Sequence, residues 1–175
     1  MKPIHLISLT TVVTVLAFTG CGRSEKDISA ASTSAVAAVV STPKAVPSEG
    51  RAIEITASDA MKFDLAEIRA KPGEALAVTL KNLGTMPKFS MGHNWVLLDA
   101  GVDLNAFAGD TGLAAKTEYI PTAYKDQIIA ATKLLGPKES DTVRFYAPAK
   151  PGRYPFICSF PGHFQVGMKG ELIVE

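Results

Sequence analysis

The sequence predicts an all-β fold, a Greek-key β-sandwich or barrel, with a short helical insertion around residues 99–133. Two observations support this prediction. From residue 51 to the C-terminus, short segments of alternating apolar and polar residues are separated by Gly- and Pro-containing turns, as in antiparallel sandwiches and barrels. Between residues 99 and 133 the alternation stops and Ala-rich pieces replace it. The chain has 175 residues, 47% of them hydrophobic, so it can bury a core and form one folded domain.

The first strands are expected over residues 51–57, 62–70 and 75–83. A Lys-Pro-Gly-Glu turn separates the second from the third. The first and third show clear alternation, which places one set of apolar side chains on a single face of each strand: Ile53 and Ile55, then Leu76, Val78 and Leu80.

The later strands are expected over residues 94–98, 141–147, 152–160 and 169–175. Between the first and second of these lies the segment 99–133, which has poor strand character. We interpret it as an insertion with one or two short helical turns that caps the sandwich.

The N-terminus has the features of an export signal. Residues 1–20 contain a Lys near the start and a short apolar stretch, as in secretory signal peptides. The sequence Ala-Phe-Thr-Gly-Cys resembles a bacterial lipobox, although Phe18 stands where Leu is usual. We expect cleavage before Cys21, lipidation of Cys21, and a membrane-anchored lipoprotein of the bacterial cell envelope that faces the periplasm or the outside. The alternatives are an ordinary secreted protein that is cleaved a few residues away and a Cys21 that belongs to a disulfide of the mature protein.

Residues 21–50 are expected to form a tether and residues 51–175 the folded domain. The tether is rich in Ala, Ser, Thr, Val and Pro, a composition typical of linkers. After residue 20 no segment is long and apolar enough to span a bilayer. The formal net charge is +1 and Lys and Arg are not clustered, which argues against a nucleic-acid partner.

Cysteine and histidine are rare and are concentrated in two short motifs. The chain has two Cys and three His. With Cys21 lipidated and His5 in the signal peptide, Cys158, His93 and His163 remain. An unpaired Cys in an exported protein is buried, paired between chains, or used as a ligand. His93 lies in Met-Gly-His-Asn-Trp, while Cys158 and His163 lie in Cys-Ser-Phe-Pro-Gly-His-Phe-Gln-Val-Gly-Met, which ends at Met168.

These four side chains predict a copper site. A thiolate, two imidazoles and a thioether suit a copper ion that cycles between Cu(I) and Cu(II). Pro161 and Gly162 are expected to turn the chain so that His163 points back toward Cys158. Zinc is an alternative, but structural zinc sites use Cys and His without Met. A Cys–His nucleophile and base is another alternative, but it leaves His93 and Met168 without a role.

The two motifs resemble the copper-binding segments of the azurin-like cupredoxins, and the likeness extends over residues 51–175. The loop pattern is most similar to that of the auracyanins. The resemblance implies a cupredoxin fold in which His93, Cys158 and His163 are the main ligands, Met168 is the axial ligand, and the Gly92 carbonyl is a weak further contact. It also implies that the amides of Asn94 and Phe160 donate to the sulfur of Cys158, that the Asn94 side chain links the two ligand loops, and that Trp95 belongs to the core.

Two features depart from azurin itself. Four residues separate His163 from Met168, where azurin has three, which is expected to affect the axial contact. The disulfide of azurin has no counterpart here, so the core and the metal must stabilise the domain.

The resemblance implies a type 1 copper electron-transfer protein that passes single electrons between redox partners at the membrane surface, not an enzyme. The alternatives are an exported protein that buffers or delivers copper and an adhesion or signalling domain that keeps the fold. An intense visible absorption after Cu(II) addition distinguishes the first from the second. The resemblance also implies a monomer whose donor and acceptor proteins dock transiently on an apolar patch around His163, formed by Met61, Met86, Met91, Phe160, Pro161, Phe164 and Val166.

Overall fold

The structure is a computed structural model and describes residues 46–175. The predicted signal peptide, Cys21 and the tether up to residue 45 lie outside the described residues.

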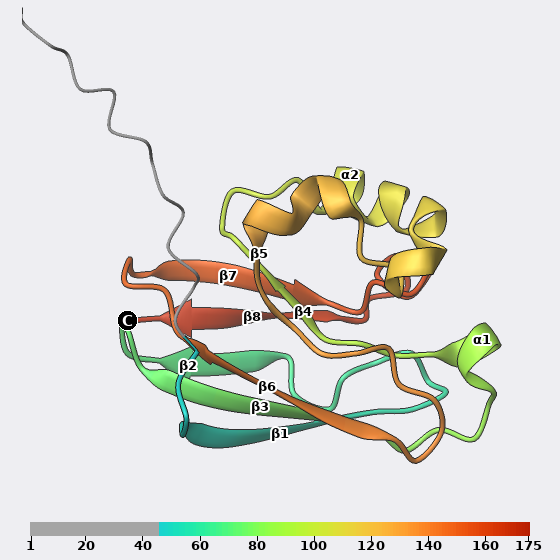
Figure 1. Cartoon of the computed structure of the whole chain (residues 1–175), viewed down its shortest axis with the longest axis horizontal. Coiled ribbons are helices and arrows are strands. Elements are labelled where there is room, and N and C mark those ends of the chain that lie inside the picture. The colour runs from blue at the N-terminus through green and yellow to red at the C-terminus, as the bar shows by residue number, and fades with distance from the viewer. Residues whose placement is uncertain (1–45) are drawn as a thin grey trace, which may run out of the picture. The chain divides into compact units, whose positions relative to one another are not determined.

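Two separate sheets form a sandwich (Figure 1). In the three-stranded sheet β3 (Ala75–Asn82) lies between β1 (Arg51–Ala57), which it pairs with in parallel, and the antiparallel β6 (Ser140–Tyr146). The five-stranded sheet has the order β2 (Glu67–Ala70), β8 (Lys169–Val174), β7 (Gly152–Ile157), β4 (Val96–Leu98) and β5 (Ile128–Ala131). The predicted all-β sandwich is confirmed. The two sheets do not close into a barrel.

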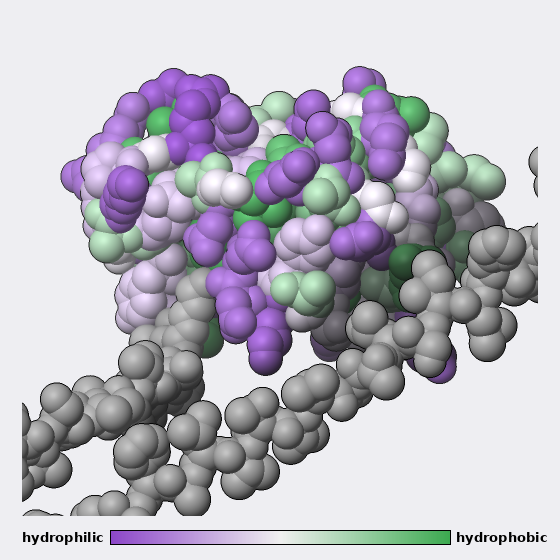
Figure 2. Space-filling model, turned by 90° about the horizontal axis from the view of Figure 1, so that it is seen from above, coloured by the Kyte–Doolittle hydropathy of each residue, from purple (hydrophilic) through white to green (hydrophobic). Residues whose placement is uncertain are grey.

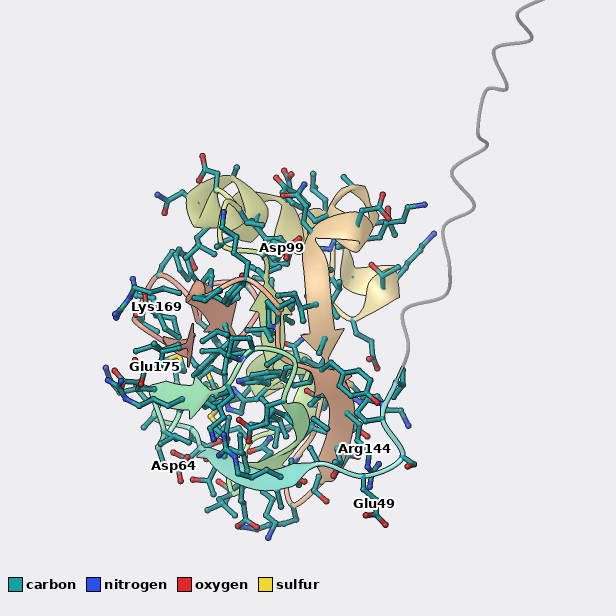
Figure 3. All side chains as sticks on the ribbon, turned by 90° about the vertical axis from the view of Figure 1, so that its left-hand side faces the viewer. Glu49, Asp64, Asp99, Arg144, Lys169 and Glu175 are labelled. Atoms are coloured by element: carbon teal, nitrogen blue, oxygen red, sulfur yellow. The ribbon has the colours of Figure 1, made fainter. Side chains whose placement is uncertain are left out.

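The core lies between the sheets, where Figure 3 shows the side chains that fill the space. The alternation in the sequence explains it, because successive side chains of a strand point to opposite faces. Ile55, Leu76, Val78 and Leu80 are fully buried from the three-stranded sheet, and Trp95 lies against Phe156 and Phe145 with ring centroids 5.4 and 5.9 Å apart. The expectation that Trp95 belongs to the core is confirmed.

The helical segment covers the outer face of the five-stranded sheet. Asp103 caps the N-terminus of the helix α2 (Leu104–Asp110). Its carboxylate accepts hydrogen bonds from the amides of Asn105 and Ala106, which have no carbonyl partner within the helix. Three 3₁₀ turns follow, Thr111–Leu113, Ala115–Thr117 and Thr122–Gln127. Phe107 packs there into a second cluster with Val96, Leu98, Val102 and Ile157. Seen from this side, hydrophilic residues and small hydrophobic areas are interspersed (Figure 2).

The structure corrects two boundaries and adds one element. The insertion was expected to continue to residue 133, but Ile128–Ala131 form β5 and pair with β4; a four-residue apolar run cannot be assigned from periodicity alone. Of residues 62–70 only Glu67–Ala70 form a strand: the chain turns at Met61, whose φ is +54°, and Phe63 then makes only an isolated bridge with Ala57. The short helix α1 (Lys88–Met91) was not predicted.

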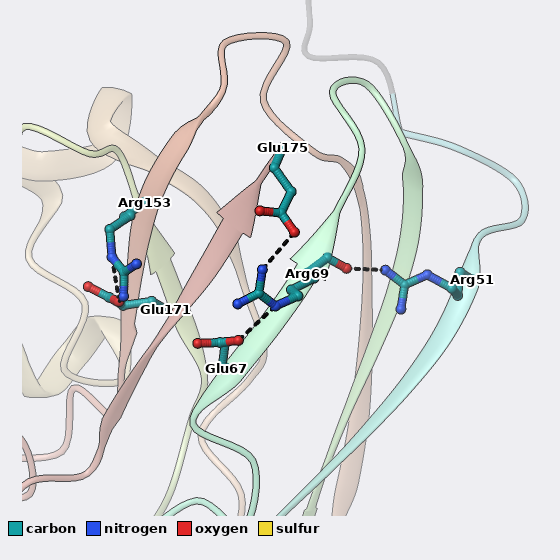
Figure 4. A network of polar contacts seen from close by, with 6 residues as sticks. All are labelled: Arg51, Glu67, Arg69, Arg153, Glu171 and Glu175. Atoms are coloured by element: carbon teal, nitrogen blue, oxygen red, sulfur yellow. Dashed lines mark hydrogen bonds and ion pairs between the residues drawn. The ribbon is translucent and has the colours of Figure 1, made fainter.

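Ion pairs connect the strands at the edge where β1 and β2 lie (Figure 4). The guanidinium of Arg69 lies between the carboxylates of Glu67 and Glu175, at 2.9 and 2.6 Å. Arg51 donates to the Arg69 carbonyl at 2.5 Å and so connects one sheet to the other. Arg153 of β7 pairs with Glu171 of β8. Among the described helices, none has the length and apolarity needed to cross a membrane.

Candidate metal centre

The loop from Cys158 to Met168 closes through its own backbone. Cys158 follows the end of β7, and its amide donates to the carbonyl of Met168 at 3.1 Å. The amide of Met168 donates to the carbonyl of His163, and the amide of His163 donates to that of Phe160. Gly162 and Gly167 have φ of +89° and +94°, which glycine adopts without steric cost. The loop therefore returns to its starting point with His163 turned inward.

A second loop supplies His93. This residue exchanges two backbone hydrogen bonds with Leu135, of 3.1 and 2.7 Å. One residue, Gly92, separates His93 from the end of α1. A Cβ atom at Gly92 would lie 2.7 Å from the carbonyl oxygen of Lys88 and 3.0 Å from the Leu134 side chain. Only glycine allows so close an approach, which fixes the entry of the chain into the site.

The donor atoms of His93, Cys158 and His163 converge. The Cys158 Sγ lies 4.0 Å from Nδ1 of His93 and 3.4 Å from Nδ1 of His163. All three donor atoms lie within 4.8 Å of one another, and all three residues are buried. Met168, on the same loop, is also fully buried, and Cys158 forms no disulfide. The structure therefore gathers the predicted ligands in one place.

Burial keeps these groups neutral in the absence of a metal. It raises the pKa of the Cys158 thiol to about 12, against the opposing effect of the backbone amides of Asn94 and Phe160. Burial, with a smaller contribution from His93, lowers the pKa of His163 to about 4. Burial also lowers the pKa of His93, while Asp59 and the Ser58 backbone act to raise it. A soft sulfur and two imidazole lone pairs thus face one point, as a copper ion requires.

Asn94 links the two loops directly. Its side-chain oxygen accepts from the amide of Ser159 at 2.8 Å, and its side-chain nitrogen donates to the Ser159 hydroxyl at 2.7 Å. These bonds hold the residue after His93 against the residue after Cys158. Ligand loops that are held in this way keep the metal donors in place.

The residues of the predicted patch differ in exposure. Met86 and Val166 are 42% and 51% exposed, and Pro161 is exposed. The others are half-buried: Met61, Met91, Phe160 and Phe164. Met61 and Phe160 pack against the main core, and Phe164 packs against the second cluster.

Sequence reasoning missed several residues around the site. Ser159 and Leu135 hold the loops through the bonds described above. Phe89 of α1 is 82% exposed. The only signal that could have pointed to Phe89 is that an aromatic residue stands shortly before a ligand motif. The contacts of Ser159 and Leu135 depend on folding and leave no such signal in the sequence.

Comparison with known proteins identifies the family. The family described as copper binding proteins, plastocyanin/azurin family, matches residues 51–175. The chain belongs to this family. The chain is 40% identical over 121 residues to the azurin of Achromobacter denitrificans, which is 67% of this chain and 80% of the relative. It is 38% identical over 127 residues to the azurin of Pseudomonas fluorescens biotype C, covering 70% of this chain and 97% of the relative.

Solved auracyanin structures share the fold. Reduced auracyanin from Roseiflexus castenholzii matches with a TM-score of 0.63 and 36% identity over 71% of this chain and 96% of the other. Auracyanin A, described as a "blue" copper protein from Chloroflexus aurantiacus, matches with a TM-score of 0.62 and 32% identity over 71% and 98%. The predicted resemblance to azurin-like cupredoxins close to auracyanin is confirmed, and the cofactor of this copper-binding domain is copper.

Proposed function

We propose that this member of the plastocyanin/azurin family is a blue copper protein that carries single electrons between redox partners at a membrane surface. The observation that carries the proposal is the convergence of His93, Cys158 and His163 within 4.8 Å in a buried place. Bound copper supplies a one-electron couple, Cu(I)/Cu(II).

Each residue has a defined task in this proposal. Cys158 supplies the thiolate, His93 and His163 supply Nδ1, and Met168 supplies a weaker axial thioether, with the Gly92 carbonyl as a further weak contact. The amides of Asn94 and Phe160 face the sulfur and favour its anionic form, because both act to lower the pKa of Cys158. The Asn94 side chain keeps the two loops together.

A carrier role is favoured over an enzymatic one by the burial of the donors. Cys158 and His93 are fully buried and His163 is 3% exposed, so a substrate has no direct access to the metal. An electron needs no such access. Apart from His5, the chain contains no histidine beyond His93 and His163, so histidine ligands for a second copper ion are lacking.

Partner proteins are proposed to dock at the patch around His163, on which Met86, Pro161 and Val166 are exposed. An apolar surface desolvates easily, and flexible Met side chains adapt to different partners. Redox encounters are brief and use small interfaces. The protein itself is proposed to be a monomer.

Attachment to a membrane is proposed to come from lipidation of Cys21, with the domain held by the tether in the cell envelope, on the periplasmic or outer side. Several acyl chains, at about 0.8 kcal/mol for each buried methylene, give a durable anchor. Mass spectrometry of the mature N-terminus tests this. A free, unmodified N-terminus beyond residue 21 contradicts it.

The decisive experiment is titration of the metal-free protein with Cu(II). We expect an intense blue absorption from the copper–thiolate bond and its complete loss in Cys158→Ser, because the sulfur is gone. A Cys158→Ser protein that stays blue contradicts the ligand assignment. Binding of Cu(I) without colour, followed by rapid release, favours the alternative of copper delivery.

A further inference from the structure

Two adjacent residues at the end of the second 3₁₀ turn have an unusual backbone. Glu118 and Tyr119 have φ of +55° and +63°, and neither is glycine. Such conformations are unfavourable for residues with a Cβ and persist where the surroundings enforce them. Here the amide of Tyr119 donates to the Ala114 carbonyl at 2.9 Å. The hydroxyl of Thr117 donates to the Ile120 carbonyl at 2.7 Å. The turn is therefore well defined.

The side chain of Tyr119 contacts the second ligand loop. Its ring meets the ring of Phe160 edge to face, with centroids 4.9 Å apart and an interplanar angle of 65°. The Phe160 ring in turn lies against the ring of His163, with centroids 4.7 Å apart. Phe160 is half-buried and also packs against the main core, so Tyr119 adds a contact to a ring that is partly open to solvent.

Glu118 contacts the first ligand loop. Its backbone carbonyl accepts from the Asn94 side chain at 3.3 Å. Its carboxylate accepts from the amide of Leu134 at 3.1 Å, next to the residue that pairs with His93. The same carboxylate lies 4.0 Å from the ammonium of Lys88 in α1. One dipeptide of the helical segment thus reaches the surroundings of both histidines.

We propose that the contacts of the dipeptide Glu118–Tyr119 with the two ligand loops hold these loops in place. In this proposal Tyr119 is a positioning residue that restrains His163 through Phe160. The proposal rests on the copper site proposed above. It gives the helical segment a task beyond covering the sheet, because loss of the Tyr119 ring removes a contact that restrains Phe160, and the Phe160 ring lies against the ring of His163. Residues that orient metal ligands in this way affect metal retention strongly.

The first test is the rate at which copper is lost from the copper-loaded full chain to an excess of chelator. We expect Tyr119→Leu to lose copper about tenfold faster than the parent protein. Tyr119→Phe keeps the aromatic edge and should stay within about twofold of the parent, because the contact needs the ring rather than the hydroxyl.

Tyr124→Leu is the matched control. Tyr124 lies in the same helical segment and makes the same kind of edge-to-face contact, with Phe107 at 5.0 Å, but that contact belongs to the cluster over the sheet. We expect no faster copper loss from this variant, even where it unfolds at a lower temperature. Equal acceleration in Tyr124→Leu and Tyr119→Leu overturns the proposal, and so does an unchanged rate in Tyr119→Leu.

The second test needs no metal. In the metal-free protein, proton NMR should show a cross-relaxation peak between the Phe160 and His163 rings that is retained in Tyr119→Phe and Tyr124→Leu and lost in Tyr119→Leu. An equally strong peak in Tyr119→Leu overturns the proposal. This readout separates the two ideas, since a parent protein that binds no copper contradicts the proposed function while the ring contact still decides the role of Tyr119.

Discussion

At the scale of single residues, the metal donors are uncharged in the metal-free protein: Cys158 is a weaker acid, and His93 and His163 are weaker bases, than in water. Burial raises the pKa of Cys158 to about 12 and lowers that of His163 to about 4. In water these groups would have ordinary values and would bind protons in competition with the metal. In the folded domain each neutral imidazole has one ring nitrogen with a free lone pair near neutral pH, and the thiol proton is the one that copper must displace.

This arrangement predicts a simple proton stoichiometry. Between about pH 7 and 9, above the ordinary pKa of histidine, from which both imidazoles are shifted downward, and below the raised pKa of Cys158, copper binding should release about one proton per metal ion, from the thiol alone. The apparent affinity should then rise roughly tenfold for each pH unit in this window. A pH-indicator dye measures the release. Release of nearly two protons at pH 7 would show that a histidine is also charged in the metal-free protein.

Met168 offers a test of the weaker ligand. Replacing Met168 by Leu removes a weak donor, and the loss of a donor favours Cu(I), while the buried volume changes little. We expect the blue colour to remain and the reduction potential to rise by at least about 60 mV, a tenfold change in the one-electron equilibrium constant. Voltammetry on both proteins checks this, with Met86→Leu, an exposed thioether, as the control. Equal potentials in Met168→Leu and the parent would remove Met168 from the ligand set.

At the scale of the elements, strands with clear alternation were predicted within a residue or two and the short irregular pieces were not. Ile53 and Ile55 predict β1 because period-two burial has no other interpretation over seven residues. The run Ile128–Ala131 has no alternation, and its pairing with β4 is decided by the sheet rather than by local sequence. At the metal centre, too, only part of the structure could be predicted from the sequence. The rarity of Cys and His predicts the ligands, but the contact of Tyr119 with Phe160 joins distant segments and leaves no pattern in the sequence.

The close packing of β7 against β8 gives a prediction about an element. A Cβ atom at Gly170 would lie 2.3 Å from the Phe156 ring and 2.4 Å from the Ala66 carbonyl oxygen. Gly170→Ala must therefore displace a fully buried ring or the backbone, which typically costs about 1–3 kcal/mol. Urea unfolding of the metal-free protein measures this. Gly101→Ala is the control, since nothing lies within 4 Å of its Cβ position, and it should change the free energy of unfolding by less than about 0.5 kcal/mol.

At the scale of the whole domain, the two ends of the sandwich differ in chemistry. Arg69 and Arg153 form ion pairs on the strands of the five-stranded sheet (Figure 4), and Arg51 of the other sheet pairs with Glu74. Exposed ion pairs of this kind contribute little to stability, but they give that surface a hydrated, charged character. Near the ligand loops Met86, Phe89 and Val166 expose apolar side chains. These apolar side chains can be removed from water at lower cost than the ion pairs when a partner docks.

Electron exchange between two copies of the protein tests whether this end is where electrons leave. Met91 is half-buried beside the ligand Gly92–His93 segment, and Met91→Lys places an ammonium there that snorkels to the surface. When two such copies meet, the like charges face each other across a small contact that excludes water. We expect self-exchange to slow at least about tenfold, equivalent to about 1.4 kcal/mol in the activation free energy, with the blue spectrum unchanged. Higher ionic strength should restore part of the rate, because salt screens the repulsion.

Tyr146→Lys is the control. It adds the same charge at an exposed position on β6, where β6 pairs with the start of β3 and not with the ligand loops. This variant should keep a rate within about twofold of the parent. NMR line broadening in mixtures of the oxidised and reduced protein measures all three rates. A folded, blue Met91→Lys protein with the parent's rate would mean that the electron leaves by another face.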